Sequence, residues 1–110
     1  MAKLIFYDKE NDILSLHKTL LSDEKFKGNV DAGQFILDVS TKGRVIGIEV
    51  MNAIDFFREF NVGKDILENL SAANFHVNMR PDGIIVGIVF KAKNLKQDIP
   101  AKIAVPLPRQ

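Results

Sequence analysis

Two aspartates that flank a predicted turn are the first residues in the chain with the potential for chemistry. Asp8 and Asp12 bracket residues 9–11, and a hairpin closed at this turn pairs the two aspartates across its strands. Two close carboxylates can share a proton, which raises one pKa, or can bind a hard cation. The simpler interpretation is that Asp8 caps its turn and Asp12 is solvated, because aspartate commonly caps turns. A calcium or magnesium site also needs further oxygen ligands, so the pair alone predicts no metal site.

Glu49 is the next candidate because it lies within 44–51, an apolar stretch that predicts a strand. A buried glutamate needs a partner or takes a raised pKa, and such a group can mark a functional site. Arg44 and Arg58 are the candidate partners. The alternative is a glutamate at an exposed strand end or in a structural ion pair.

The histidines give the remaining candidates. His76 shares the polar side of a predicted strand, 73–79, with Asn74 and Asn78, where the three either line a shallow pocket or form a solvated face. Ser15 and His17 point to the same side of another strand, but no nucleophile-elbow motif surrounds the serine. We assign no catalytic residue and expect no metal and no cofactor. The candidate site residues are Asp8, Asp12, Glu49 and His76.

The composition restricts the class of protein. The chain has 110 residues, of which 46% are hydrophobic and 26% charged, and this predicts one soluble globular domain over residues 1–110. No run approaches the roughly 18 apolar residues of a membrane helix, and the N-terminal apolar stretch is too short for a signal peptide. The chain has no cysteine, which excludes disulfides, thiolate metal sites and a cysteine nucleophile. We therefore expect a cytoplasmic protein that does not bind a membrane.

The charge is nearly balanced, with 15 basic and 14 acidic residues. Residues 91–110 hold five basic residues and one acidic residue, and such a tail can attract an acidic partner. Domains that bind nucleic acid are usually far more basic, and they interleave aromatic with basic residues to stack bases. The charge pattern therefore argues against a nucleic-acid partner.

Three hairpins and a helical stretch account for most of the chain. The predicted strand pairs are 3–8 with 12–18, 33–39 with 44–51, and 73–79 with 84–91. Asn11 takes the left-handed position of the first turn, which pairs Phe6 with Leu14. Residues 22–32 read as a polar loop, 52–70 as two helical pieces, and the proline-rich stretch 99–107 as an edge strand or an extended strap.

These elements predict an α+β fold. The expected architecture is a mainly antiparallel sheet of about seven short strands, with one or two helical segments between two similar β-hairpins.

Residues 33–52 and 73–92 form an internal repeat. They align without a gap at an offset of 40, and Gly43 and Gly47 match Gly83 and Gly87. The match indicates duplication of one hairpin, and chance similarity between two hairpins is the alternative. A glycine inside a strand usually marks a bulge or a close backbone approach.

The repeat leads to an expectation of self-association. Phe35 and Leu37 are predicted on one face of the first copy, and Ile48 and Val50 on the other. A sheet that is apolar on both sides must be covered on both sides, and the helical pieces can cover only one. Each Ile or Val left in water forfeits about 1.5–3 kcal/mol. We therefore expect a homodimer.

Two motifs in the first half carry a family resemblance. The opening 7–14, YDKENDIL, and the later stretch 43–53, which contains GIEV and ends in Ala53, resemble the small prokaryotic domains grouped as domain of unknown function 2283. The resemblance covers about residues 4–55. It implies a small β-rich fold with no established activity, and some members look like antitoxin-type partners of small toxins. The second half departs from the pattern because an added hairpin replaces the usual short ending.

Three functional hypotheses follow. The first is a non-enzymatic structural or interaction module that acts as a homodimer. The second, implied by the resemblance alone, is an antitoxin-like protein that binds a small protein toxin. The third is a protein that binds a small ligand or a metal through Asp8, Asp12 or Glu49.

Overall fold

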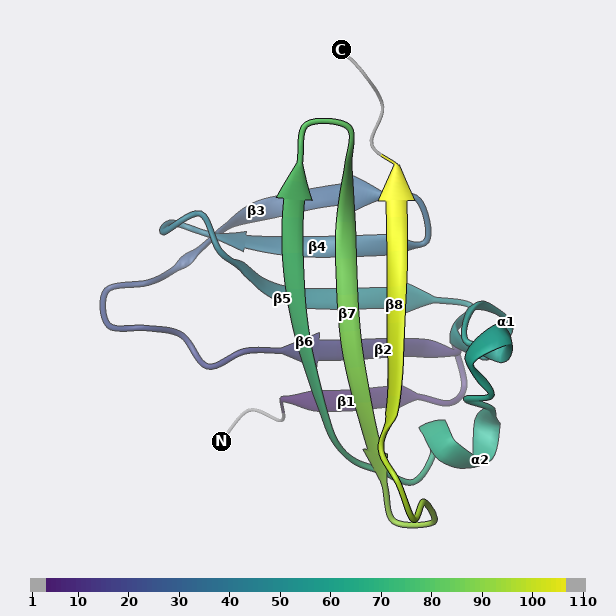
Figure 1. The fold of residues 1–110 in the computed structure, drawn as a ribbon. Helices are drawn as coiled ribbons and strands as arrows, with labels where there is room; N and C mark the ends of the chain where they lie inside the picture. The colour runs from purple at the N-terminus through teal and green to yellow at the C-terminus, as the bar shows by residue number, and fades with distance from the viewer. Residues whose placement is uncertain (1–3, 107–110) are drawn as a thin grey trace. The chain divides into compact units, whose positions relative to one another are not determined.

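A computed structural model describes residues 4–106 of the chain and shows a mainly β fold (Figure 1). Within this range eight strands form two antiparallel sheets, and the α+β prediction is therefore wrong. The helical stretch contains only α1 (Ala53–Phe56), the 3₁₀-helix η1 (Arg58–Phe60) and α2 (Lys64–Leu67). Asn61 takes a left-handed conformation with φ of 60°, which ends η1 after one turn. The predicted strand residues Lys3 and Leu107 lie outside the described range.

The first sheet, sheet A, has five strands in the order β1-β2-β5-β4-β3. Its strands are β1 (Ile5–Asp8), β2 (Ile13–His17), β3 (Phe26–Ala32), β4 (Phe35–Ser40) and β5 (Val45–Met51). Strand β3 lies within the stretch that was predicted as a polar loop. It pairs with β4 at the sheet edge, where backbone hydrogen bonds stabilise a strand that buries little more than Ala32.

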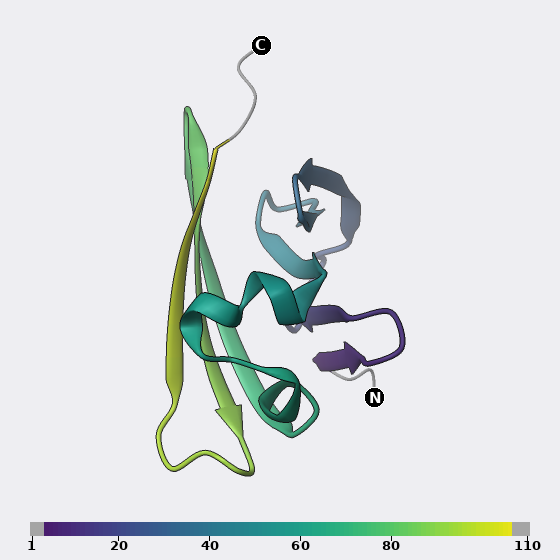
Figure 2. The same ribbon diagram turned by 90° about the vertical axis from the view of Figure 1, so that its right-hand side faces the viewer.

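The second sheet, sheet B, has three strands in the order β6-β7-β8. Its strands are β6 (Leu70–Arg80), β7 (Gly83–Ala92) and β8 (Ile99–Pro106). The predicted edge strand near the C-terminus is confirmed as β8. The helical segment lies beside this sheet (Figure 2). The two are in contact, because the ring of the buried Phe57 meets that of Phe90 edge-to-face with 5.1 Å between centroids.

The chain forms two compact units. The first ends at Ala53 and contains sheet A, and the second begins at Ile54 and contains the helical segment and sheet B. That residues 1–110 make a single domain stays a prediction.

The fully buried apolar residues of the central hairpin of sheet A, formed by β4 and β5, lie on one face. Leu37 pairs with Ile48, and Phe35 pairs with Val50. Directly paired residues point to the same side of a sheet, so the predicted split of these residues over two faces is wrong. The pairing depends on the turn length and on a bulge between Asp38 and Val39, which local sequence does not reveal. The buried face contains Leu14, Leu16, Phe35, Leu37, Ile48 and Val50, each at most 2% exposed.

The first hairpin is shifted by one residue from the predicted register. Tyr7, not Phe6, pairs with Leu14. The left-handed residue of the turn is Asp12, with φ of 55°, in place of Asn11. A shift of one residue turns every side chain to the other face, so Phe6 lies on the opposite side from Leu14.

The two predicted hairpin copies differ in register. Leu37 pairs with Ile48 in sheet A, and the offset of 40 predicts Val77 opposite Ile88. Phe75 takes that place instead, because the β6–β7 hairpin closes tightly at Arg80 and Gly83. The registers of the two hairpins differ by two residues, and a shift of two leaves each side chain on the same face of its sheet. Descent from one duplicated hairpin stays a prediction.

Candidate functional site

The carboxylate of Asp8 accepts hydrogen bonds within its own turn. Its Oδ1 accepts hydrogen bonds from the backbone N–H groups of Glu10 and Asn11 at 3.1 and 3.2 Å, and its Oδ2 accepts one from Asn11 Nδ2 at 2.9 Å. These bonds, led by that of the Asn11 side chain, lower the pKa of Asp8. Asp8 pairs with Ile13, so the predicted Asp8–Asp12 pair is wrong. The prediction that Asp8 caps its turn is confirmed, but Asp12 is half-buried and bound by Tyr7 rather than solvated.

Asp12 is also bound within the first unit. The Tyr7 hydroxyl donates a hydrogen bond of 2.6 Å to Asp12 Oδ1, and the backbone N–H of Ala53 donates to the Asp12 carbonyl oxygen at 3.1 Å. Asp12 therefore connects the first turn with the end of β5. Both aspartates have structural partners that account for their positions.

Glu49 lies half-buried on the face of sheet A opposite the apolar core. It pairs with Ser15 on one side and Ile36 on the other. Neither predicted arginine binds it. Arg44 pairs with Glu24, and Arg58 pairs with Asp55.

Sequence reasoning missed the buried acid, Glu24. Its side chain accepts hydrogen bonds from Ser40 Oγ at 2.5 Å and the Leu21 N–H at 2.8 Å, and Arg44 Nε lies 3.2 Å away. Glu24 is only 5% exposed and Ser40 is fully buried. The Leu21 amide and then the Ser40 hydroxyl lower the pKa of Glu24, with further help from Arg44 and Lys42. No local motif marks the cluster, because Glu24 and Ser40 are 16 residues apart.

His76 lies over a glycine in the neighbouring strand. A Cβ built on Gly87 would stand 2.5 Å from His76 Cε1 and 2.6 Å from Nε2, so the imidazole fills the space of a missing side chain. His76, Asn74 and Asn78 are all exposed, in agreement with a solvated face. On the other side of Gly87 lies Lys102 of β8. At this mid-strand glycine the close neighbour is a side chain, not the backbone or a bulge that was predicted.

Gly47 of sheet A repeats this arrangement. A Cβ there would stand 2.9 Å from His17 Nδ1 and 2.7 Å from Asp38 Oδ2. Asp38 also accepts a hydrogen bond of 2.5 Å from Asn29 Nδ2. The row His17, Gly47, Asp38, Asn29 thus crosses four strands. The sequence grouped His17 with Ser15, and its neighbour across Gly47 was missed because pairing between strands is non-local.

These rows define the open face of sheet A, the side opposite its apolar core. The second row runs from Phe6 through Ser15, Glu49 and Ile36 to Asp31. Phe6 is 52% exposed, and Leu4, just before β1, is 50% exposed. The face combines carboxylates with large apolar side chains, and we take it as the candidate functional surface.

Two surface hollows in the second unit contain none of the four candidate residues. One, of about 270 Å³, lies at the β6–β7 turn and includes Arg80, Gly83 and Pro106. The other, of about 320 Å³, includes Ile54, Arg58 and Val62. Within residues 4–106, no three His, Asp or Glu side chains are grouped so that they could hold a metal ion. No helix in this range is both long enough and apolar enough to cross a membrane.

Comparison with known proteins finds a family match within the first unit. Residues 4–53 match the family described as "Protein of unknown function (DUF2283)", which confirms the resemblance over this segment. The match ends at Ala53, where the first unit ends. Within it, the motif residues Tyr7, Asp8, Asp12 and Ala53 are the ones that hold the first turn together.

The chain is also similar to an uncharacterized protein of Methanocaldococcus jannaschii, with 40% identity over 71 residues. This match covers 64% of the chain and 56% of that protein, so the chain spans little more than half the length of this relative. The match spans 71 residues and the first unit ends at Ala53, so the match must extend into the second unit. No solved structure matches the chain. Both matches are to proteins without an assigned activity.

Proposed function

We propose that the protein is a non-enzymatic interaction module that acts as a homodimer and uses the open face of sheet A in the contact. The observation that carries this proposal is the exposure of Phe6 and Leu4 at the β1 edge of that face. Large apolar side chains that lie together in solvent are typical of association surfaces.

The surroundings of Phe6 also support a contact surface. Ile13, Ile36 and Met51 lie half-buried on the same face. Ile13 pairs with Asp8 and Met51, and Ile36 pairs with Glu49. A mixture of apolar centres and polar groups is usual at interfaces between subunits. Full burial of a phenylalanine stabilises by about 1.5–3 kcal/mol, and Phe6 is half covered already, so a symmetric contact gains roughly that amount over two copies.

The test is the oligomeric state of the full chain, measured by sedimentation equilibrium from micromolar to millimolar concentration. We expect a dimer that Phe6→Ser weakens about tenfold, because the substitution removes the apolar contact. Leu20→Ser is the matched control, since Leu20 is 49% exposed but lies in the loop after β2. A wild-type chain that remains monomeric throughout would overturn the proposal.

The other predicted roles stay predictions. The antitoxin-like role rests on the family resemblance. Binding of a small ligand or a metal through Asp8, Asp12 or Glu49 also stays a prediction. The side chains of Asp8 and Asp12 are engaged in the β1–β2 turn, and Glu49 lies within β5.

A further inference from the structure

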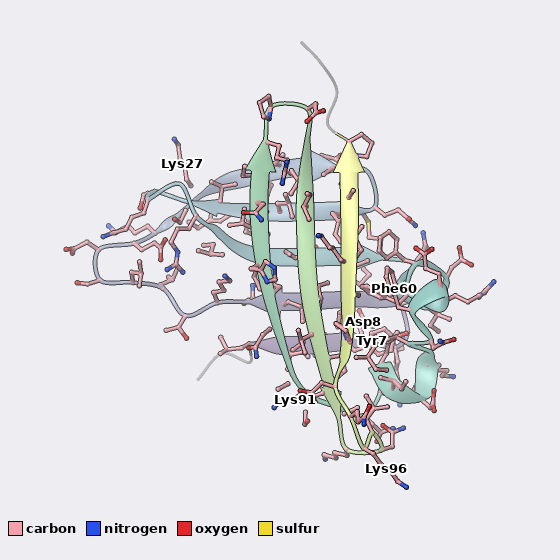
Figure 3. The ribbon with its side chains drawn as sticks, in the orientation of Figure 1. Tyr7, Asp8, Lys27, Phe60, Lys91 and Lys96 are labelled. Atoms are coloured by element: carbon pink, nitrogen blue, oxygen red, sulfur yellow. The ribbon has the colours of Figure 1, made fainter. Side chains whose placement is uncertain are left out.

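The open face of sheet A is acidic. Its acidic residues are Asp8, Asp31, Asp38 and Glu49, and His17 lies on the same face. Within the described strands of sheet A the basic side chain is Lys27, which lies at the bulge of the edge strand β3 (Figure 3).

The open face of sheet B has the opposite charge. Arg80, Lys91 and Lys102 lie on the same side of the sheet as His76, and strands β6, β7 and β8 contain no aspartate or glutamate. Lys91, labelled in Figure 3, binds Asp98 of the following loop at 3.7 Å. Arg80 and Lys102 are exposed.

The two faces also share a pattern of side chains. Each has a mid-strand glycine next to an imidazole, and the third residue of the row is Asp38 in sheet A and Lys102 in sheet B. Half-buried apolar residues lie in the neighbouring rows, such as Ile36 in sheet A and Val89 in sheet B. Opposite charges in similar surroundings make the two faces complementary.

We propose that the open face of sheet A in one copy of the chain docks on the open face of sheet B in a second copy. This inference rests on the proposed homodimer and specifies its surfaces. A contact between two A faces sets carboxylates against carboxylates, and a contact between two B faces sets cations against cations. Only the mixed contact joins charges of opposite sign, and like-charge pairing disfavours the other two.

The A-on-B contact joins two different surfaces, so a closed homodimer must make it twice, once in each direction. A contact that does not close in this way produces longer chains of subunits. Because the charges are at the surface, the association weakens as salt shortens the screening length, which is about 10 Å at 0.1 M.

The experiment uses two charge-reversed full-length chains. Asp31→Lys with Glu49→Lys removes the net negative charge of the A face, and Arg80→Glu with Lys102→Glu makes the B face acidic. We expect each variant alone to dimerise at least about tenfold more weakly than wild type. When the two are mixed, the unchanged A face of the second meets the unchanged B face of the first, so a heterodimer forms. Native mass spectrometry with one variant ¹⁵N-labelled detects it.

Net charge is controlled by substitutions outside the sheets. Glu59→Lys with Glu68→Lys, and Lys64→Glu with Lys93→Glu, change the total charge equally and should leave the dimer intact. If wild type is dimeric but the face variants dimerise normally, or their mixture forms no heterodimer, the docking inference is wrong and the proposed homodimer stands. If wild type is monomeric, both are wrong. Assemblies longer than a dimer that are lost in the face variants support the docking and contradict the homodimer.

Discussion

The imidazole of His76 occupies the space above Gly87, with Nε2 only 2.6 Å from where a Cβ of that glycine would stand. Gly87→Ala therefore forces the ring to move. Because His76 is exposed, the ring can swing aside, and we expect a loss of about 1 kcal/mol in the free energy of unfolding. Urea denaturation measures the loss. In a chain that also has His76→Ala the added methyl meets no ring, so the cost of Gly87→Ala should nearly vanish. Equal costs in both backgrounds would contradict this explanation.

Gly83 presents a stiffer obstacle than Gly87. A Cβ there would stand 2.8 Å from the backbone oxygen of Val105, which cannot move without disturbing β8. We expect Gly83→Ala to cost more than Gly87→Ala, about 2–3 kcal/mol. Gly28→Ala is the control, since a Cβ at Gly28 meets no atom within 4 Å. Denaturant titration of the three variants gives the order, and a cost for Gly83→Ala no larger than that of the control would contradict the geometry.

Features that depend on residues close together in the sequence could be predicted from the sequence. Asp8 caps its turn because the amides it binds are two and three residues away, and turn chemistry of this kind is local. The register of the same hairpin was wrong by one residue, since both Asn11 and Asp12 tolerate a left-handed conformation and Asp12 adopts it. The resulting shift of one residue in register places Phe6 on the open face instead of the buried face.

Non-local relationships escaped prediction. Glu24 gave no signal because two of its partners, Ser40 and Arg44, lie 16 and 20 residues further along the chain. The row that joins His17 to Asp38 needs the order of the strands in sheet A, in which β2 lies beside β5. The glycines within strands did mark both rows, although they did not identify the side chains above them.

The buried carboxylate of Glu24 should make stability depend on pH. Hydrogen bonds from Leu21 and Ser40 hold its pKa in the folded chain below the ordinary value of 4.5. A carboxyl with a lowered pKa stabilises the fold above its unfolded pKa, and this contribution is lost as pH falls through the folded pKa. We expect the free energy of unfolding to decrease below about pH 4.5, as followed by urea denaturation at a series of pH values.

Glu24→Gln separates this effect from general acid denaturation. The variant should be less stable than wild type near neutral pH, because Arg44 loses its charged partner. Its stability should fall less steeply in acid. Glu10→Gln is the matched control, since Glu10 is exposed in the first turn. The same acid slope in wild type and Glu24→Gln would show that another carboxyl is responsible.

The hydrogen bond between Tyr7 and Asp12 gives the last prediction. Tyr7→Phe keeps the ring but removes the hydroxyl that donates to Asp12 Oδ1, so we expect a loss of about 0.5–1.5 kcal/mol. Asp12→Ala should cost more, because alanine also lacks the tolerance for a φ of 55° that aspartate has. Asp12→Asn keeps both an acceptor oxygen and this tolerance, and it should be the mildest change at position 12. Thermal or urea unfolding of the three variants tests the order, and an Asp12→Ala chain as stable as Asp12→Asn would mean that neither the bond nor the backbone conformation stabilises this hairpin.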